Sequence, residues 1–183
     1  THIHYYKRIP AFHLWFRGQG QVSKSVRVNY VNERQNRIRT YTISVEPIAG
    51  YEKEKKLNIN VSAGFNYNSS QSSLQPDLLT KYWTQDYSFD LTLYLPWQLK
   101  FNNNLHVTLR QKTDAFNKND RYNWNAYLGR SWKSAMVKVS AFDILDQNIG
   151  FNRVINSNFV AERTFDTIRR YLLLSFIWNF KKS

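Results

Sequence analysis

Residues 57–68 read LNINVSAGFNYN, and this stretch decides the class of fold. Apolar residues alternate with Asn, Ser or Gly along its whole length. Successive side chains of a β-strand point to opposite faces of a sheet, so a period of two residues is typical of a strand. The stretch therefore predicts a β-strand with one apolar and one polar face.

The same alternation recurs in other parts of the chain. Long runs extend from Tyr87 to Phe101 and from Leu172 to Phe180, and shorter runs lie at residues 26–30, 41–45, 105–109, 122–128 and 137–141. No segment carries the 3.6-residue apolar period of an amphipathic helix. The sequence therefore predicts an all-β fold, an antiparallel sheet of about eight strands.

The connections between the predicted strands are of two kinds. The short ones, polar and suited to tight turns, are residues 52–55, 102–104 and 133–134. The long ones, rich in Asn, Ser, Gln and Asp, are residues 69–81, 113–120 and 146–164. Outer-membrane barrels have this asymmetry, with short periplasmic turns and long extracellular loops.

Composition narrows the class further. The chain has 183 residues, enough for one domain, and it contains no cysteine, which excludes disulfide and thiolate chemistry. Aromatic residues make up 16% of the chain and the formal net charge is +13, a combination usual in proteins that meet nucleic acid or a membrane. The longest wholly apolar runs have only about three residues, as at Leu172–Leu174, whereas a membrane-spanning helix needs roughly 20 apolar residues. Helical transmembrane topology is thereby excluded.

The apolar face decides between a membrane barrel and a soluble sheet. A soluble sandwich or barrel fills its interior with a mixture of large and small side chains. Here the apolar face is mostly large, and aromatic residues cluster toward the predicted strand ends, as in the girdles of membrane barrels. We therefore predict an antiparallel transmembrane β-barrel segment, part of a larger barrel. A soluble β-sandwich or barrel is the alternative.

The facing of individual residues follows from the alternation. The residues expected to face lipid are Leu57, Ile59, Val61, Phe65, Leu91, Leu93, Leu95, Leu105, Val107, Leu174 and Phe176. Those expected to face a wet interior are Asn58, Asn60, Ser62, Asn66, Thr92, Thr108, Asn123 and Asn125. The aromatic residues expected at the membrane interfaces are Tyr87, Trp97, Phe101, Trp178 and Phe180.

Two stretches near the C-terminus carry a family resemblance. Residues 141–148 read AFDILDQN and residues 170–180 read RYLLLSFIWNF. They resemble the end of TonB-dependent-receptor-like outer-membrane barrel proteins, in which an FDLLNQN-like stretch closes the penultimate strand and an RYFMLSFTYRF-like strand ends the protein. Less specific matches are residues 36–41, residues 67–70, and Leu95-Pro96-Trp97 within a long strand.

The resemblance implies that residues 1–183 are the C-terminal part of an outer-membrane β-barrel, with a closing strand at residues 165–180. Family members also carry an N-terminal carboxypeptidase-like domain, a plug and many earlier strands. We therefore expect an open sheet whose edges pair with the remaining strands of the same barrel. By resemblance, Phe176 and Phe180 would belong to the C-terminal signal recognised during membrane insertion.

The resemblance also implies a function and a location. The whole protein would import a scarce solute across the Gram-negative outer membrane, and this segment would supply wall strands and outer loops. The nearest alternative is a non-transporting accessory barrel that works with a surface lipoprotein or a secretion-system component. From another class, a soluble basic β-domain that binds nucleic acid or glycan would explain the charge and leave the apolar stripes unexplained.

The basic residues favour a lipid partner over nucleic acid. Arginines gather near the predicted long-loop ends of strands, whereas the aromatic residues lie in apolar stripes without basic residues between them. On an outer-membrane barrel this end faces lipopolysaccharide, whose phosphates suit arginine. The candidates for contact with lipopolysaccharide are Arg34, Arg37, Arg39, Arg169 and Arg170.

One long loop contains candidates for recognition of a ligand or protein partner. Within residues 146–164 these candidates are Phe151, Arg153 and Phe159. Aromatic and arginine side chains dominate binding hot spots, which is why these three stand out. Packing between neighbouring loops is the alternative role for the same side chains.

The sequence contains no recognisable pattern for catalysis or cofactor binding. Nucleophile-elbow, zinc-protease and phosphate-loop motifs are absent. His2 and His4 would share a strand face, but no third metal ligand is evident beside them. Asp86 and Asp90 would share a face about 13 Å apart, too far for a paired-carboxylate site. We therefore expect no enzymatic activity, metal or cofactor.

Overall fold

A computed structural model describes residues 1–77, 79–112, 120–148, 150–155 and 160–180 of the chain. Most of these residues lie in strands, and the only helical elements among them are two short 3-10 turns, η1 (Pro10–Phe12) and η2 (Pro96–Gln98). The strands are β1 (His2–Ile9), β2 (Leu14–Val31), β3 (Arg34–Lys53), β4 (Leu57–Ser72), β5 (Leu79–Leu95), β6 (Leu99–Arg110), β7 (Arg121–Ser131), β8 (Ala135–Phe142), β9 (Gly150–Ile155), β10 (Val160–Phe165) and β11 (Tyr171–Trp178).

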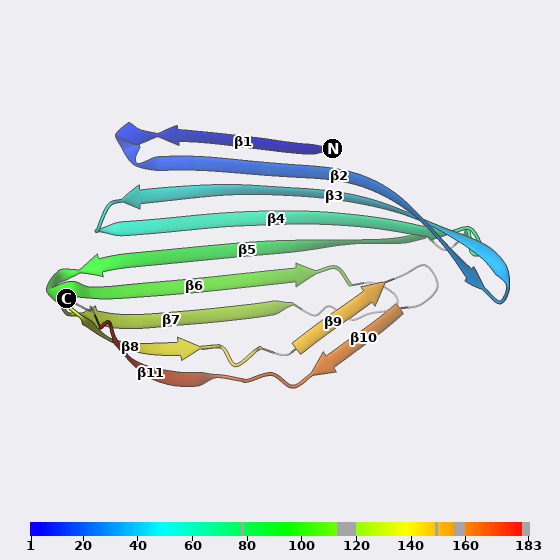
Figure 1. Cartoon of the computed structure of the whole chain (residues 1–183). Coiled ribbons are helices and arrows are strands. Elements are labelled where there is room, and N and C mark those ends of the chain that lie inside the picture. Colours follow the sequence, from blue (N-terminus) through cyan, green and yellow to red (C-terminus); the bar gives the residue numbers. More distant parts are fainter. Residues whose placement is uncertain (78, 113–119, 149, 156–159, 181–183) are drawn as a thin grey trace.

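Nine of the strands form one antiparallel sheet in the order β1-β2-β3-β4-β5-β6-β7-β8-β11 (Figure 1). Strands β9 and β10 form a separate hairpin between β8 and β11. Because β1 and β11 lie at opposite edges and do not pair with each other, the sheet is open. The predictions of an all-β fold and of an open antiparallel sheet are therefore confirmed. No helix in the described part of the chain is long and apolar enough to cross a membrane.

The long alternating run from Tyr87 to Phe101 is two strands joined by a tight turn. Pro96 begins the turn η2, in which Trp97 and Gln98 both have a φ of 60°. Leu95 lies opposite Leu99, four residues further on. Because this spacing is even, the apolar alternation continues in phase across the turn, and the sequence pattern does not reveal the turn. The prediction of a single strand through Leu95-Pro96-Trp97 was therefore wrong.

The predicted turn at residues 102–104 was wrong for the same reason. These three asparagines lie inside β6, opposite Thr92, Leu91 and Asp90 of β5. The Asn102 side chain donates a hydrogen bond to Thr92 Oγ1 at 3.0 Å, and the Asn104 side chain donates one to Asp90. Cross-strand polar pairs of this kind hold asparagine in a strand despite its preference for turns. The turns predicted at residues 52–55 and 133–134 are confirmed.

Two of the predicted long loops are mostly strand. Strand β4 continues through Ser72, where the Ser72 hydroxyl donates a 2.7 Å hydrogen bond to Oδ1 of the fully buried Asn36 on β3. The connection from β4 therefore begins at Ser73. The hairpin of β9 and β10 occupies much of residues 146–164, and the predicted closing strand at 165–180 is the shorter β11. Residues 113–119 lie outside the described part of the chain.

The hairpin of β2 and β3 extends well past the neighbouring strands (Figure 1). These strands have 18 and 20 residues, against a usual strand length of about five or six. Val31 pairs with Arg34, which leaves a two-residue turn in which Asn32 and Glu33 have φ of 49° and 65°. Two positive φ values identify a type I′ turn, whose twist matches that of the flanking strands.

Glycine at position 33 should stabilise this hairpin. The left-handed conformation costs a non-glycine residue roughly 1–2 kcal/mol, of which the greater flexibility of an unfolded glycine offsets about 0.5–1 kcal/mol. Asn-Gly is moreover the preferred type I′ pair. The expected result for Glu33→Gly is a gain of about 0.5 kcal/mol, seen as slower amide exchange in residues 28–37. Asn32→Gly is the control and should give no gain, since Asn already tolerates this conformation.

Candidate functional site

The strand register divides the nine-stranded sheet into two faces. Directly opposed residues of an antiparallel pair point to the same side, so the pairing can be followed from strand to strand. Val61 lies opposite Phe89, Phe89 opposite Leu105 and Leu105 opposite Trp124. On the other face Ser62 lies opposite Ser88 and so shares its side of the sheet. We name these the apolar face and the polar face.

All residues whose facing was predicted fall consistently on these two faces. The apolar face carries Leu57, Ile59, Val61, Phe65, Leu91, Leu93, Leu95, Leu105, Val107, Leu174 and Phe176. The polar face carries Asn58, Asn60, Ser62, Asn66, Thr92, Thr108, Asn123 and Asn125. Alternation within single strands thus matches the pairing across the sheet.

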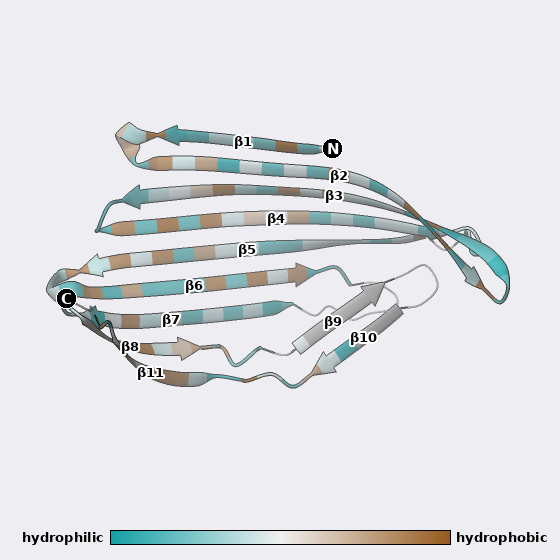
Figure 2. Cartoon of the chain, in the orientation of Figure 1, coloured by the Kyte–Doolittle hydropathy of each residue, from teal (hydrophilic) through white to brown (hydrophobic). Residues whose placement is uncertain are grey.

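The apolar face is largely uncovered in this chain. Val61, Phe176 and Leu174 are 48%, 63% and 72% exposed. Six others are only partly exposed between their neighbours in the sheet: Leu57, Ile59, Leu91, Leu93, Leu105 and Val107. Figure 2 shows apolar and polar bands alternating along β4, β5 and β6, with mostly polar residues toward the far ends of β2 and β3. Among the described residues Ile48 is the only buried hydrophobic side chain, and it lies on the polar face opposite Ser62. An exposed apolar surface of this extent needs a partner that covers it.

Side chains on the polar face form hydrogen bonds between adjacent strands. Thr108 Oγ1 donates to Asp86 Oδ1 at 2.7 Å, and the hydroxyls of Ser62 and Ser88 are 2.6 Å apart. His106 Nε2 lies 3.7 Å from the same Asp86 oxygen. Residues of this face include most of the buried polar side chains, such as Ser70, Thr108 and Ser140. This difference in burial is expected when a sheet curves around its polar face.

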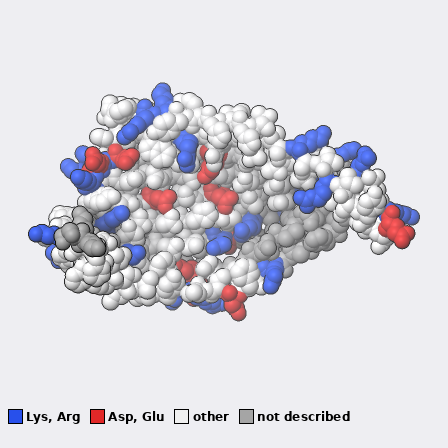
Figure 3. Space-filling model, in the orientation of Figure 1, with Lys and Arg blue, Asp and Glu red and all other residues white. Residues whose placement is uncertain are grey.

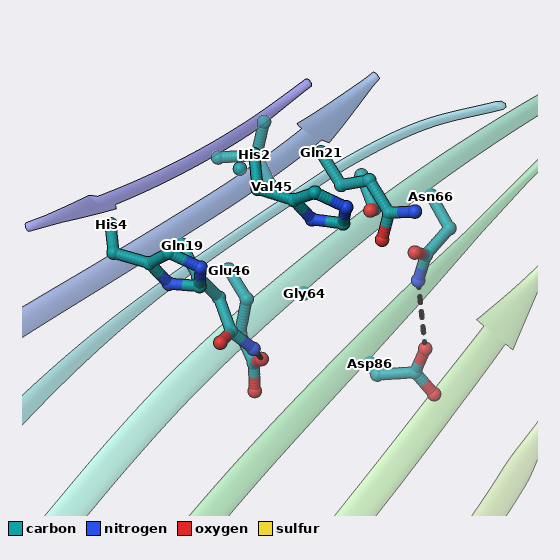
Figure 4. Close-up of a pocket in the computed structure, with 11 residues that line it drawn as sticks. His2, His4, Gln19, Gln21, Val45, Glu46, Gly64, Asn66 and Asp86 are labelled. Carbon is teal, nitrogen blue, oxygen red and sulfur yellow. Dashed lines mark hydrogen bonds between the residues drawn. The ribbon is translucent and has the colours of Figure 1, made fainter. Parts of the chain in front are cut away.

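A hollow of about 320 Å³ lies on the polar face above Gly64 (Figure 4). Gly64 has no side chain to fill the space between Glu46 on β3 and Asp86 on β5. The Gln19 amide donates to the Glu46 carboxylate, and Asn66 Nδ2 donates to Asp86 Oδ2 at 3.4 Å. Acidic and basic side chains both gather over the middle of this face (Figure 3). The hollow is thus a polar indentation whose acidic groups already have amide or hydroxyl partners.

The two N-terminal histidines border the same hollow. His2 and His4 share the polar face of β1, with ring centroids 6.5 Å apart and nearly parallel planes. No group of three or more His, Cys, Asp or Glu able to hold a metal occurs in the described part of the chain. Asp86 and Asp90 also share the polar face, and each accepts a hydrogen bond from β6.

The predicted interface aromatics take different positions. Trp97 lies in the turn η2 and is 76% exposed, Phe101 is near the start of β6, and Trp178 ends β11. The Trp178 and Phe180 rings stack with centroids 5.7 Å apart. Tyr87 is in the middle of β5, where its ring meets Phe65 edge-on, so the prediction of a strand-end position for Tyr87 was wrong.

The predicted arginines separate into three places. Arg37 and Arg39 are exposed on the apolar face of β3, beyond Tyr41. Arg34 begins β3 at the tip of the long hairpin. Arg169 and Arg170 lie in the segment before β11, at the other side of the sheet. The structure therefore does not bring the five arginines together.

The recognition candidates lie in or beside the hairpin of β9 and β10. Phe151 and Arg153 are in β9, where they pair with Thr164 and Glu162 of β10. Phe159 lies outside the described residues. The structure thus assigns the backbone of two candidates to a strand instead of a loop.

A buried carboxylate at the start of this segment was missed by the sequence analysis. Asp143 is 3% exposed, and its two carboxylate oxygens accept hydrogen bonds from the backbone N–H groups of Gln147 and Asn148 at 3.0 and 2.9 Å. Its own N–H donates to Asn125 Oδ1 at 2.9 Å. The signal was present in the quoted stretch AFDILDQN, because Asp tolerates the positive φ of 49° found at Asp143 and can bond to the backbone that follows it.

Asn148 continues this network toward β11. Its Oδ1 accepts a 3.0 Å hydrogen bond from the Arg121 guanidinium of β7, and its backbone carbonyl accepts one from the Thr167 hydroxyl. The segment that leads into β11 is therefore linked to β7 through Asn148. Comparison with protein-family models, with curated proteins and with solved structures found no match for the chain.

Proposed function

We propose that this chain forms part of the wall of an outer-membrane β-barrel, with the apolar face against lipid and the polar face toward a wet lumen. The single observation that carries the proposal is the uncovered apolar face, continuous across nine strands and backed by a hydrogen-bonded polar face. A soluble protein could not keep such a surface in water. Lipid supplies the missing cover without any further protein layer.

The length of the apolar stripe supports the same proposal. On β4 the apolar positions run from Leu57 to Tyr67, eleven residues in total, and Ser69 and Gln71 follow on the same face. A transmembrane strand needs about 9–11 residues at a tilt near 45°. The part of β4 with an apolar face thus has the length of one membrane crossing, and the remainder would stand outside the bilayer.

The open edges of the sheet complete the proposed architecture. A barrel in lipid must satisfy every backbone N–H and C=O, because the hydrocarbon core contains no water to bond with them. We propose that β1 and β11 pair with further strands of the same barrel. The short turns would then lie on the periplasmic side, and the long β2–β3 hairpin and the β9–β10 hairpin on the outside.

The finer function that we propose is import of a solute by a TonB-dependent-receptor-like protein. Its support is the resemblance carried by residues 141–148 and 170–180. In the structure Asp143 of the first stretch bonds to Asn125 of β7, and β11 of the second stretch pairs with β8. This segment would contribute wall and outer surface and no catalytic group. A non-transporting accessory barrel has the same wall, so solute uptake by cells with and without the protein is the measurement that separates the two.

Cysteine labelling of adjacent residues tests the facing directly, and the chain offers a cysteine-free background. Phe65 and Asn66 are neighbours on β4 that point to opposite faces. A fluorophore on Phe65→Cys should be quenched by lipids carrying a quencher in their acyl chains, whereas the same fluorophore on Asn66→Cys should respond to a water-soluble quencher. Membranes from cells that produce each variant are the material for this measurement.

Two outcomes would contradict the proposal. Equal quenching at the two positions would mean that the sheet has no lipid-facing side. Release of the protein from membranes by high salt without detergent would favour a soluble basic domain, since electrostatic binding to nucleic acid or lipid weakens steeply with salt.

A further inference from the structure

The apolar face of the nine-stranded sheet carries no acidic side chain. The Asp and Glu residues within its strands are Glu46, Glu52, Asp86 and Asp90, and the register places all four on the polar face. Basic residues, in contrast, occur on both faces. A protein surface that faces only water usually carries acidic and basic side chains intermixed, so the confinement of the acidic side chains to one face needs a separate explanation.

Four of the basic residues on the apolar face lie together, just beyond the apolar stripe. The last apolar row is Val22, Ile43, Tyr67 and Trp83. In the next row Lys24 pairs with Tyr41, Tyr41 with Ser69, and Ser69 with Lys81. Arg39 and Arg37 follow at two-residue steps along β3. We name Lys24, Arg37, Arg39 and Lys81 the basic belt.

The belt is compact and has no acidic partner. Three interstrand steps separate Lys24 from Lys81, which corresponds to about 14 Å. All four side chains are exposed, and none forms an ion pair with a described residue. The Lys24 ammonium lies 5.4 Å from the centroid of the Tyr41 ring, so the aromatic edge of the apolar stripe and the belt are in contact.

We propose that the basic belt binds the phosphate groups of lipopolysaccharide in the outer leaflet. The inference rests on the proposed function, because it places the belt at headgroup depth. Lysine and arginine extend their aliphatic stems along apolar surface and keep their charged ends in the polar layer. Val22, Val26 and Val28 flank the belt on β2 and provide that surface. Arginine also binds phosphate through two parallel hydrogen bonds.

The belt revises the set of lipid contacts that the sequence suggested. Arg37 and Arg39 remain in it, whereas Arg34 lies further out at the hairpin tip and Arg169 and Arg170 belong to the other side of the sheet. Lys24 and Lys81 enter it only through the register, since they are 57 positions apart in the sequence. The belt also marks the outward end of the barrel, on the side of the long hairpin.

The test compares two variants with equal loss of charge. The belt variant combines Lys24→Gln, Arg37→Gln, Arg39→Gln and Lys81→Gln. The control variant combines Arg8→Gln, Arg17→Gln, Arg27→Gln and Lys100→Gln, four basic residues of the polar face. Each protein is purified from membranes in detergent, its bound lipopolysaccharide is measured by mass spectrometry, and its affinity is measured by titration with purified lipopolysaccharide.

The belt variant should bind lipopolysaccharide several hundredfold more weakly, because each of the four basic residues near an anionic surface contributes about fivefold. The control variant should bind as the parent does. Lipopolysaccharide stripped of its phosphates should bind the parent no better than it binds the belt variant. The single variant Arg39→Gln should show a smaller loss, which covers the case in which the fourfold variant fails to fold.

Several results would overturn the inference. Equal binding by the belt and control variants would show that the belt is not the site. Equal affinity of the parent for vesicles of phosphatidylglycerol would assign the belt to any anionic lipid, and preference for a single-stranded oligonucleotide would assign it to nucleic acid. If extraction needs detergent and the belt variant keeps its bound lipopolysaccharide, only the inference about the belt is refuted. If extraction needs no detergent, the proposed membrane barrel itself is refuted.

Discussion

Replacing Val61 with arginine should destabilise the membrane-inserted protein by about 2–4 kcal/mol, the cost of an arginine at the bilayer midplane on the lipid face of a barrel. Val61 lies near the centre of the apolar stripe of β4 and points away from the hydrogen-bonded face. The equilibrium constant for folding should fall by roughly thirtyfold to several hundredfold. Denaturant unfolding of the protein in lipid vesicles, followed by tryptophan fluorescence, measures the change.

The adjacent residue provides a matched control. Asn60 lies at the same depth on the polar face, opposite Asp90, and its Oδ1 has no hydrogen-bond partner among the described residues. An arginine there would face water and a carboxylate, so Asn60→Arg should change stability by less than about 1 kcal/mol. Val61 is 48% exposed in the chain alone. In a water-soluble protein Val61→Arg would therefore be nearly neutral, within about 0.5 kcal/mol, and that outcome would contradict the membrane proposal.

Removal of the Asp143 carboxylate should have the second large effect. Asp143→Ala leaves the N–H groups of Gln147 and Asn148 without their acceptor next to a nearly fully buried site. Hydrogen bonds to a charged group are each worth about 1.5–3 kcal/mol, so a loss of about 3 kcal/mol is expected. The loss should be local, because the turn holds the segment that leads into β11. Limited proteolysis of intact membranes should show new cleavage within residues 146–170.

The conservative substitution Asp146→Asn is the control for this site. Asp146 is exposed, and its Oδ1 accepts a 3.3 Å hydrogen bond from the Arg170 N–H. Asparagine retains an acceptor and tolerates the φ of 56° found there, so this variant should resist protease as the parent does. If Asp143→Ala showed the same protease pattern as Asp146→Asn, the carboxylate would have no role in fixing the segment.

The two faces of the sheet could be predicted from sequence because the relevant physics is local. In β4 a period of two places Leu57 and Val61 on one side and Asn58 and Ser62 on the other, whatever the neighbouring strands are. Bulky residues at the apolar positions then led to the prediction that this side faces lipid, which stays a prediction. These inferences needed no knowledge of which strands pair.

The errors arose where pairing decides the structure. The asparagines of residues 102–104 favour turns by themselves, and only the opposite residues of β5 hold them in a strand. Ser70 and Ser72 resemble loop residues in sequence, but in the structure their hydroxyls form hydrogen bonds with Thr40 and Asn36 of β3 and they belong to strand β4. Local propensity is a weak guide when cross-strand contacts are available. The arginines proposed from the sequence to contact lipopolysaccharide did not include Lys24 and Lys81 for the same reason. These two lysines lie near the arginines of β3 only because of the strand register.

The tip of the β2–β3 hairpin has a practical consequence. Seven residue steps separate Tyr41, at the edge of the apolar stripe, from Arg34 beside the turn. At about 3.3 Å per residue and a strand tilt near 40°, the turn would stand roughly 18 Å above the hydrocarbon boundary. In the proposed barrel, an epitope inserted between Asn32 and Glu33 would therefore be displayed on the cell surface without disturbing the wall beneath it.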